Sequence, residues 1–155
     1  MAQPWSPESP HDHAVLQVLL AVRAFSDAMD RMYGGMKDEM DMNVSDLSAL
    51  RMLIMREQGG EVVSPHDLAN HLRISTASTT KLLDRLTEAG HVERLPHPTD
   101  GRARIIVLTP HSRRTFSEHF SERLQAMRGV ADRYSDDELA AIRRFLGELG
   151  DVLAE

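Results

Sequence analysis

The segment 64–109 constrains the fold most strongly, because the spacing of its apolar residues changes from helical to extended along its length. The pattern predicts two short helices, over residues 65–72 and 75–89, and a connection this short makes the helices cross steeply. Residues 92–95 and 104–108 are β-branched and apolar in character and are separated by prolines, a glycine and charged residues, which predicts a β-hairpin with a long basic tip. Together these elements form the pattern of a winged helix-turn-helix.

Capping residues mark the ends of these helices. Ser64 supplies an N-cap hydroxyl, Pro65 occupies the first helical position and Asp67 places an acid in the first turn, which together predict a helix start. Gly90 ends the second helix, because glycine adopts the left-handed conformation of a helix C-terminus at the lowest cost. A further helix is predicted from Ser45, as its N-cap, to about residue 57.

Amphipathic helices are predicted at both ends of the chain. Residues 13–44 carry one apolar seam in steps of three and four residues, formed by Val15, Val18, Val22, Phe25, Met29, Met32 and Met36. In residues 110–153, a helix that opens with a capping box of Ser135 and Glu138 carries a second seam, formed by Leu139, Ile142, Leu146, Leu149 and Leu153. Seams of this kind predict that both ends of the chain pack against a partner.

These elements define one protomer over residues 13–153, with dimerisation helices at 13–44 and 110–153 and a winged helix-turn-helix lobe at 45–109. The length of 155 residues and the hydrophobic content of 41% suit a single folded domain. Residues 1–12 hold three prolines among small and polar residues. We expect this segment to be a flexible tail rather than a helix.

The composition excludes several classes of chemistry. The chain has no cysteine, so disulfides, thiolate metal sites and thiol nucleophiles are excluded. Its eight histidines are scattered and form no recognisable metalloprotease, nucleophile-elbow or phosphate-loop motif, so we expect neither an enzyme nor a cofactor. No segment resembles a signal peptide or a membrane span, which makes a cytoplasmic protein the expectation.

The charge of the chain is unevenly distributed. The formal net charge is −6, but residues 71–114 contain eight basic and four acidic residues and so carry a net positive charge. A basic block inside an acidic chain is typical of a face that attracts a polyanion, although the same numbers also arise from charge fluctuation along a solvated surface.

The outer face of the predicted helix 75–89 suits the major groove of DNA. If Thr79, Leu82, Leu83 and Leu86 point inward, a rotation of about 100° per residue turns another set outward. This set comprises Ala77, Ser78, Lys81 and Arg85, with Thr76 and Thr80 beside them near the N-terminal end. Small hydroxyl residues allow close approach, and the two basic residues supply charge for phosphates and bases. The alternative is that these serines and threonines only cap and solvate the helix.

The predicted hairpin tip suits the minor groove, because an arginine held away from the body fits a narrow, electronegative groove. Arg102 is the best candidate, and Arg104 and the helix-capping Ser64 complete the candidate DNA contacts. Asp100 faces repulsion from phosphates, so we expect it to stiffen the wing by pairing with a nearby arginine, for which Arg104 is the obvious neighbour.

Asp100, Arg102, Leu108 and Thr109 form a D-x-R-x-x-x-x-x-L-T pattern that resembles the wing signature of the MarR family of bacterial transcription regulators. Residues 86–94 are similar to the junction L-x-x-x-G-hydrophobic-hydrophobic-x-R of that family, with His91 in place of an apolar residue. The helix order resembles the family from about residue 13 to residue 153.

This resemblance implies a mainly helical winged helix-turn-helix protein that dimerises through its N- and C-terminal helices and binds a pseudo-palindromic DNA operator, as a ligand-responsive repressor. It also implies a pocket for a small aromatic or phenolic ligand, for which the candidates are Met32, Tyr33, Met36 and Met55. The alternative is that these methionines only fill the core.

Two other functions remain open from the sequence. Some relatives sense zinc through histidine and carboxylate ligands, which makes a zinc-responsive regulator of the same fold one alternative. Winged helices also serve as protein-interaction modules, so a module that does not bind DNA is the other.

Overall fold

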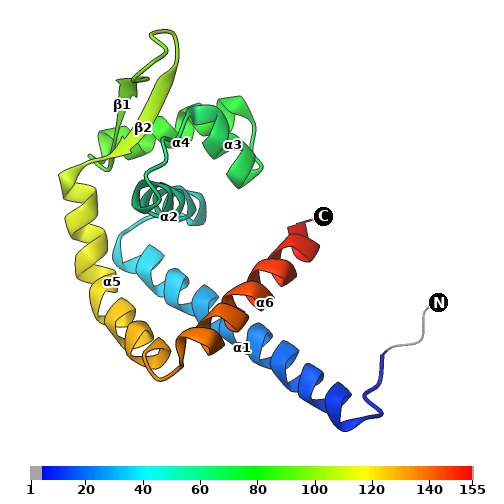
Figure 1. Ribbon diagram of the computed structural model, residues 1–155. Helices are drawn as coiled ribbons and strands as arrows, with labels where there is room; N and C mark the ends of the chain where they lie inside the picture. The colour runs from blue at the N-terminus through cyan, green and yellow to red at the C-terminus, as the bar shows by residue number, and fades with distance from the viewer. Residues whose placement is uncertain (1–4, 155) are drawn as a thin grey trace. The chain divides into compact units, whose positions relative to one another are not determined.

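The computed structural model describes residues 5–154, which form six helices and one antiparallel two-stranded sheet (Figure 1). The elements in chain order are α1 (Pro10–Glu39), α2 (Val44–Gln58), α3 (Pro65–Leu72), α4 (Thr76–Glu88), β1 (Val92–Pro96), β2 (Arg104–Leu108), α5 (Pro110–Ala131) and α6 (Asp136–Ala154). The chain divides into two compact units, Met1–Thr109 and Pro110–Glu155, and each is described separately. No helix among the described residues is long and apolar enough to cross a membrane.

Helix α1 begins earlier than the sequence predicts. Ser9 is its N-cap and Pro10 its first residue, so the prediction of a non-helical tail over residues 1–12 is wrong from residue 10 onward. Residues 1–4 of that predicted tail lie outside the described residues. The physical reason is that proline is well tolerated in the first turn, where its missing N–H leaves no hydrogen bond unmade. A capping box holds this turn, because Ser9 Oγ accepts from the N–H of Asp12 while Asp12 Oδ2 accepts from the N–H of Ser9.

The start of α2 also differs from the prediction. The N-cap is Asn43 rather than Ser45, and Asn43 Oδ1 accepts a hydrogen bond from the N–H of Asp46 at 2.9 Å. Asparagine and serine are both good N-caps, so their order in the chain does not decide between them. Ser45 instead lies inside the first turn. Helix α2 then runs to Gln58, close to the predicted end, and Gly60 follows with a φ of 72°.

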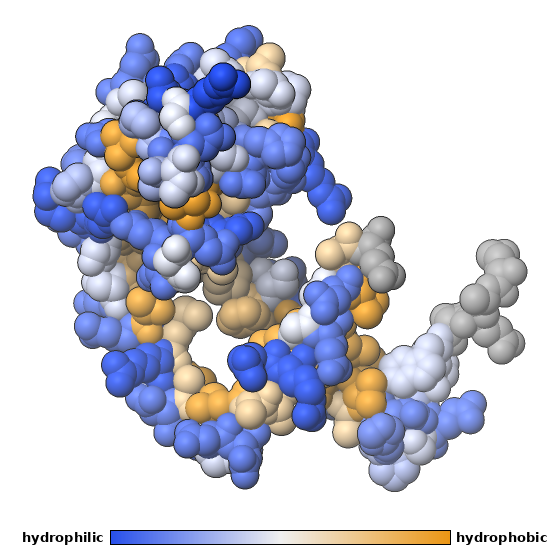
Figure 2. All heavy atoms as spheres, turned by 45° about the horizontal axis from the view of Figure 1, so that its top comes forward, coloured by the Kyte–Doolittle hydropathy of each residue, from blue (hydrophilic) through white to orange (hydrophobic). Residues whose placement is uncertain are grey.

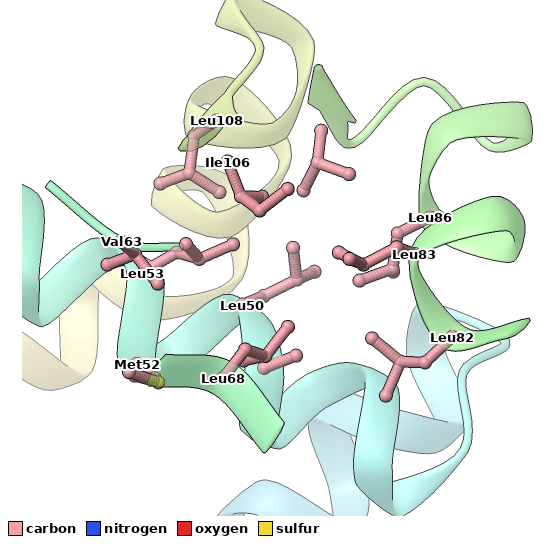
Figure 3. Packing of buried hydrophobic residues seen from close by; sticks show 12 residues of the cluster. Leu50, Met52, Leu53, Val63, Leu68, Leu82, Leu83, Leu86, Ile106 and Leu108 are labelled. Atoms are coloured by element: carbon pink, nitrogen blue, oxygen red, sulfur yellow. The ribbon is translucent and has the colours of Figure 1, made fainter. Parts of the chain in front are cut away.

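The core of the first unit lies where α2, α3, α4 and the hairpin meet (Figure 3). Apolar residues from all four elements are buried there: Leu50, Met52, Leu53, Leu68, Leu82, Leu83, Leu86, Val92, Ile106 and Leu108. The hairpin pairs Val92 with Leu108 at its base and Pro96 with Arg104 near its tip. The sequence-based positions of α3 and β2 are confirmed, and those of α4 and β1 differ by one residue at their ends.

An isolated antiparallel β-bridge pairs Val63 with Ile106 of β2, beside the hairpin. The N–H of Ile106 donates to the carbonyl of Val63 at 2.8 Å, and both side chains belong to the core. The sequence alone does not predict this bridge. The bridge ties the connection between α2 and α3 to β2.

The second unit contains α5 and α6. The predicted capping box at the start of α6 is confirmed, because Glu138 Oε2 accepts from the N–H of Ser135 and Ser135 Oγ accepts from the N–H of Glu138. No residue of α6 is buried. Its exposed large apolar residues are Ile142, Phe145, Leu146, Val152 and Leu153.

Candidate nucleic-acid interface

A tight turn joins α3 to α4. Arg73 adopts the left-handed conformation with a φ of 54°, and the N–H of Ile74 donates to the carbonyl of Ala69 at 3.1 Å. Ser75 then caps α4, with its Oγ accepting from the N–H of Ser78 at 3.1 Å. This arrangement is a helix-turn-helix, and it leaves the first turn of α4 exposed.

The two faces of α4 differ as predicted. Thr79, Leu82, Leu83 and Leu86 are buried, whereas Thr76, Ala77, Ser78, Thr80 and Lys81 are exposed. The buried leucines fix the rotation of the helix about its axis. The outer face is therefore held toward solvent at its N-terminal half, with small side chains that allow close approach.

Two hydroxyls of this face already make hydrogen bonds within the helix. Thr80 Oγ1 donates to the carbonyl of Thr76 at 3.0 Å, and Ser78 Oγ accepts from Ser75 Oγ at 3.0 Å. A hydroxyl oxygen has two lone pairs, so both side chains keep acceptor capacity, and Ser78 keeps its own hydrogen for donation. The local bonds restrict the rotamers of these hydroxyls without burying them.

Arg85 does not present a free guanidinium. Its Nη2 donates to Asp46 Oδ1 of α2 at 2.9 Å, and the side chain of Asp46 is only 10% exposed. The hydrogen bond that Arg85 donates to Asp46 raises the pKa of Arg85 above its usual value. The side chain that the sequence places among the DNA contacts therefore links α4 to α2.

Ser64 is also committed to the local structure. Its Oγ accepts from the N–H of Asp67 at 3.1 Å and donates to Asp67 Oδ2 at 2.9 Å. Asp67 Oδ2 accepts a second hydrogen bond from the N–H of Ser64, and this bond is the largest cause of the lowered pKa of Asp67. The predicted capping box of α3 is confirmed, and it occupies the Ser64 hydroxyl.

The hairpin forms the wing, which we define as β1, β2 and the connecting residues 97–103. Arg102 and Arg104 are both exposed. Asp100 Oδ1 accepts from the backbone N–H of Arg102 at 3.0 Å. The pairing of Asp100 with Arg104 that the sequence suggests is not among the ion pairs of the described residues. Asp100 stiffens the tip through a backbone hydrogen bond instead.

Arg94 links the wing to α4, a role that is not among the predictions from the sequence. Its Nη2 donates to Asp84 Oδ1 at 2.7 Å and lies 3.5 Å from the carbonyl of Thr80, so it links β1 to α4. The available signal was its place at the end of the junction pattern of residues 86–94. Hydrophilic residues cover most of the surface around the wing (Figure 2).

The predicted ligand-pocket residues have different environments. Met36 is buried, Met32 and Tyr33 are half-buried, and Met55 is 70% exposed. The guanidinium carbon of Arg51 lies 3.3 Å from the centroid of the Tyr33 ring, which is a cation–π contact between α2 and α1. Among residues 5–154, no group of three or more histidines and carboxylates is placed to hold a metal.

Comparisons with known proteins agree with this geometry. A sequence model of the MarR family matches residues 40–103. YcgE, an HTH-type transcriptional regulator of Bacillus subtilis, is 32% identical over 89 residues, which cover 57% of this chain and 58% of YcgE. PecS of Dickeya dadantii is 26% identical over 96% of this chain and 90% of PecS. The repressor YetL of B. subtilis is 30% identical over 59% of this chain and 55% of YetL.

Solved structures show the same fold. A MepR variant from a multidrug-resistant S. aureus isolate superposes with a TM-score of 0.69 at 18% identity, covering 88% of this chain and 96% of MepR. A second MepR variant, solved bound to an oligodeoxyribonucleotide, superposes with a TM-score of 0.55 at 18% identity, covering 88% of this chain and 97% of MepR.

The different roles of Arg85 and Lys81 predict different effects on folding. Arg85→Ala leaves the largely buried carboxylate of Asp46 without its cation, so we expect the free energy of unfolding to fall by about 1 kcal/mol. Lys81→Ala removes an exposed side chain of the same helix and is the matched control, with a change within about 0.5 kcal/mol. Urea denaturation at equal protein concentrations measures both. Equal stability of the two variants would show that the Asp46 contact does not anchor α4.

Proposed function

Because this chain belongs to the MarR family of transcription regulators, we propose that it binds a pseudo-palindromic DNA operator as a homodimer and represses transcription there. The observation that carries this proposal is the pairing of an exposed, small-residue face on α4 with a wing that exposes Arg102 and Arg104. A helix of this kind fits the major groove, and a projecting arginine fits the adjacent minor groove.

The proposed contacts fall into two groups. Thr76, Ala77 and Ser78 lie in the first turn of α4, where side chains reach base edges when a recognition helix enters the groove by its N-terminal end. Lys81, Arg102 and Arg104 supply positive charge for phosphates and groove edges. Ser64 and Arg85 have bonded side chains, so we assign them to holding the lobe together and leave them outside the contact set.

The apolar surface of α6 supports association of two copies. Four large apolar residues of this helix, Ile142, Leu146, Val152 and Leu153, are at least 40% exposed. Helix α1 likewise exposes several residues of its predicted seam. Figure 2 shows such apolar residues, in orange, at the surface. Burial of these side chains in a dimer removes apolar area from water and brings two recognition helices to one operator.

We extend the proposal to regulation by a small aromatic or phenolic ligand. The half-buried side chains of Met32 and Tyr33 offer apolar and aromatic surface, and thioethers adapt to ligands of different shape. The exposure of Met55 makes it the weakest of the four pocket candidates. Release of the operator requires that the ligand binds the dimer more tightly in a spacing of recognition helices that does not match the DNA.

The alternative functions have less support. A protein-interaction module gives no reason for both the wing and the outer face of α4 to expose basic residues. A zinc-responsive regulator has no observation in its favour among the described residues. The proposal of a repressor follows the simplest mechanism, in which a bound dimer occludes a promoter, and the relative YetL is named a repressor.

Selection of sequences from randomised duplex DNA tests the proposed function. We expect the purified protein, at near-physiological salt, to enrich a pseudo-palindrome whose half-sites lie about one helical turn apart. Binding without enrichment, falling steeply with salt, would contradict sequence-specific recognition and leave only a basic face. Absence of binding would favour the protein-interaction module.

The wing contributes to affinity if Arg102 enters the minor groove. We expect Arg102→Ala to weaken binding to the selected operator by about 1 to 3 kcal/mol, because a positioned guanidinium is lost from the DNA contact. Fluorescence anisotropy with a labelled operator measures the change. Arg133→Ala, which removes an exposed arginine outside the winged segment, is the control and keeps its affinity. An unchanged affinity for Arg102→Ala would exclude the wing from the interface.

A charged substitution tests whether the apolar face of α6 forms the dimer interface. Leu146 is 47% exposed on the predicted seam, and Leu146→Glu would place a carboxylate in the proposed interface. We expect this variant to sediment as a monomer and to lose operator binding. Arg144 lies two positions earlier, hence on the opposite face, so Arg144→Glu introduces the same charge as a control and leaves the dimer intact. A dimeric Leu146→Glu variant would move the interface away from α6.

A further inference from the structure

The tip of the wing is folded around one histidine. The backbone N–H of His97 donates to the carbonyl of Ala103 at 3.1 Å, and the N–H of Ala103 donates to the carbonyl of Asp100 at 3.1 Å. Nδ1 of the His97 ring lies 3.2 Å from the N–H nitrogens of both Thr99 and Asp100, and 3.2 Å from Thr99 Oγ1. His97 is half-buried by these neighbours, although the adjacent tip residues are exposed.

These contacts fix the chemical role of the ring. A backbone N–H can only donate, so Nδ1 is the acceptor of both bonds. A side-chain acceptor that binds the amides two and three residues ahead is the geometry of an Asx-turn, which asparagine and aspartate ordinarily form. His97 therefore performs with Nδ1 what Asn performs with Oδ1.

The turn leads directly to the arginine that projects from the wing. Asp100 donates its backbone N–H to His97 and accepts the N–H of Arg102 on Oδ1 at 3.0 Å. The side chains of His97 and Asp100 thus bind successive parts of the tip backbone. The bond from Arg102 to Asp100 depends on the position of Asp100, which the bond to His97 sets. Arg102 itself is exposed.

We propose that His97 is a positioning residue for DNA binding, which sets the backbone of the wing so that Arg102 enters the groove. This inference rests on the proposed function, in which Arg102 contacts the operator. Without the Nδ1 acceptor, the amides of Thr99 and Asp100 bind water, and the tip samples more conformations. Ordering it again on DNA then costs free energy, which lowers affinity without removing any DNA contact.

His97 is not part of the hydrophobic core. The effect of replacing His97 on DNA binding can therefore be separated from an effect on folding. The core cluster takes residues from β1 and β2 at Val92, Ile106 and Leu108, and within the described chain none comes from the tip, residues 97–103. We therefore expect substitutions of His97 to leave the thermal unfolding midpoint unchanged within about 2 °C, since surface changes away from the core have small effects.

A double-mutant cycle on operator binding tests the inference. We expect His97→Ala to weaken binding about 2- to 12-fold, the equivalent of one ordinary hydrogen bond, and His97→Asn to restore it to within about twofold, because Asn keeps an acceptor for the two amides. In the Arg102→Ala background, His97→Ala should add less than about a twofold loss, because a positioning residue has no effect once the group it positions is gone. Anisotropy with the selected operator gives the affinities of the wild type and the four variants, and circular dichroism confirms folding.

Four outcomes overturn the inference. An equal loss from His97→Ala with and without Arg102 would show that His97 acts independently of the arginine. Failure of His97→Asn to restore affinity would show that the ring, rather than its acceptor, matters. If Arg102→Ala weakens binding and His97→Ala does not, only the inference fails; if Arg102→Ala has no effect on operator binding, the proposed role of the wing fails with it.

Discussion

Burial of the inner face of α4 is the constraint on which the rest of the first unit depends. Leu82, Leu83 and Leu86 are almost fully buried, and removing each side chain from water is worth about 1.5 to 3 kcal/mol. Three leucines on one side of a 13-residue helix leave it a single favourable rotation about its axis. The outward direction of Ala77 and Lys81 follows from that rotation, so the core determines which residues can face a nucleic acid.

Ion pairs refine this placement and reduce the charge that the lobe offers to a polyanion. Arg85 binds Asp46 of α2, and Arg94 binds Asp84 of α4. Each pair neutralises one arginine of the basic block while attaching α4 to a neighbouring element. Among the proposed DNA contacts, this leaves Lys81, Arg102 and Arg104 as the exposed basic side chains, on α4 and on the wing. Positive charge at these fixed positions favours a docking orientation over general attraction.

The features that could be predicted from the sequence are those encoded within a few residues. Capping predicts the start of α3 correctly, because Ser64 and Asp67 hydrogen-bond to each other and Pro65 occupies the first helical position. The β-branched and apolar character of residues 104–108 predicts β2. The partner of Arg85 could not be predicted in this way, because Asp46 is 39 residues away and the contact exists only after α2 and α4 pack. The bridge between Val63 and Ile106 could not be predicted for the same reason, because it joins residues that are distant in the sequence. At the wing, the sequence suggests Arg104 as the partner of Asp100, whereas Asp100 Oδ1 accepts from the backbone N–H of Arg102.

The two units differ in how far they bury their apolar residues. Helix α4 buries four residues within its own chain, whereas α6, with more apolar residues on its seam, buries none. A 19-residue helix with an uncovered seam gains little stability from propensity alone, because helices in water depend on tertiary packing. In the proposed homodimer, the core within each chain therefore fixes the recognition surface. The spacing of the two recognition surfaces depends instead on the apolar interface between the two chains. In such a dimer, the proposed ligand would alter the spacing without disturbing the fold of α4.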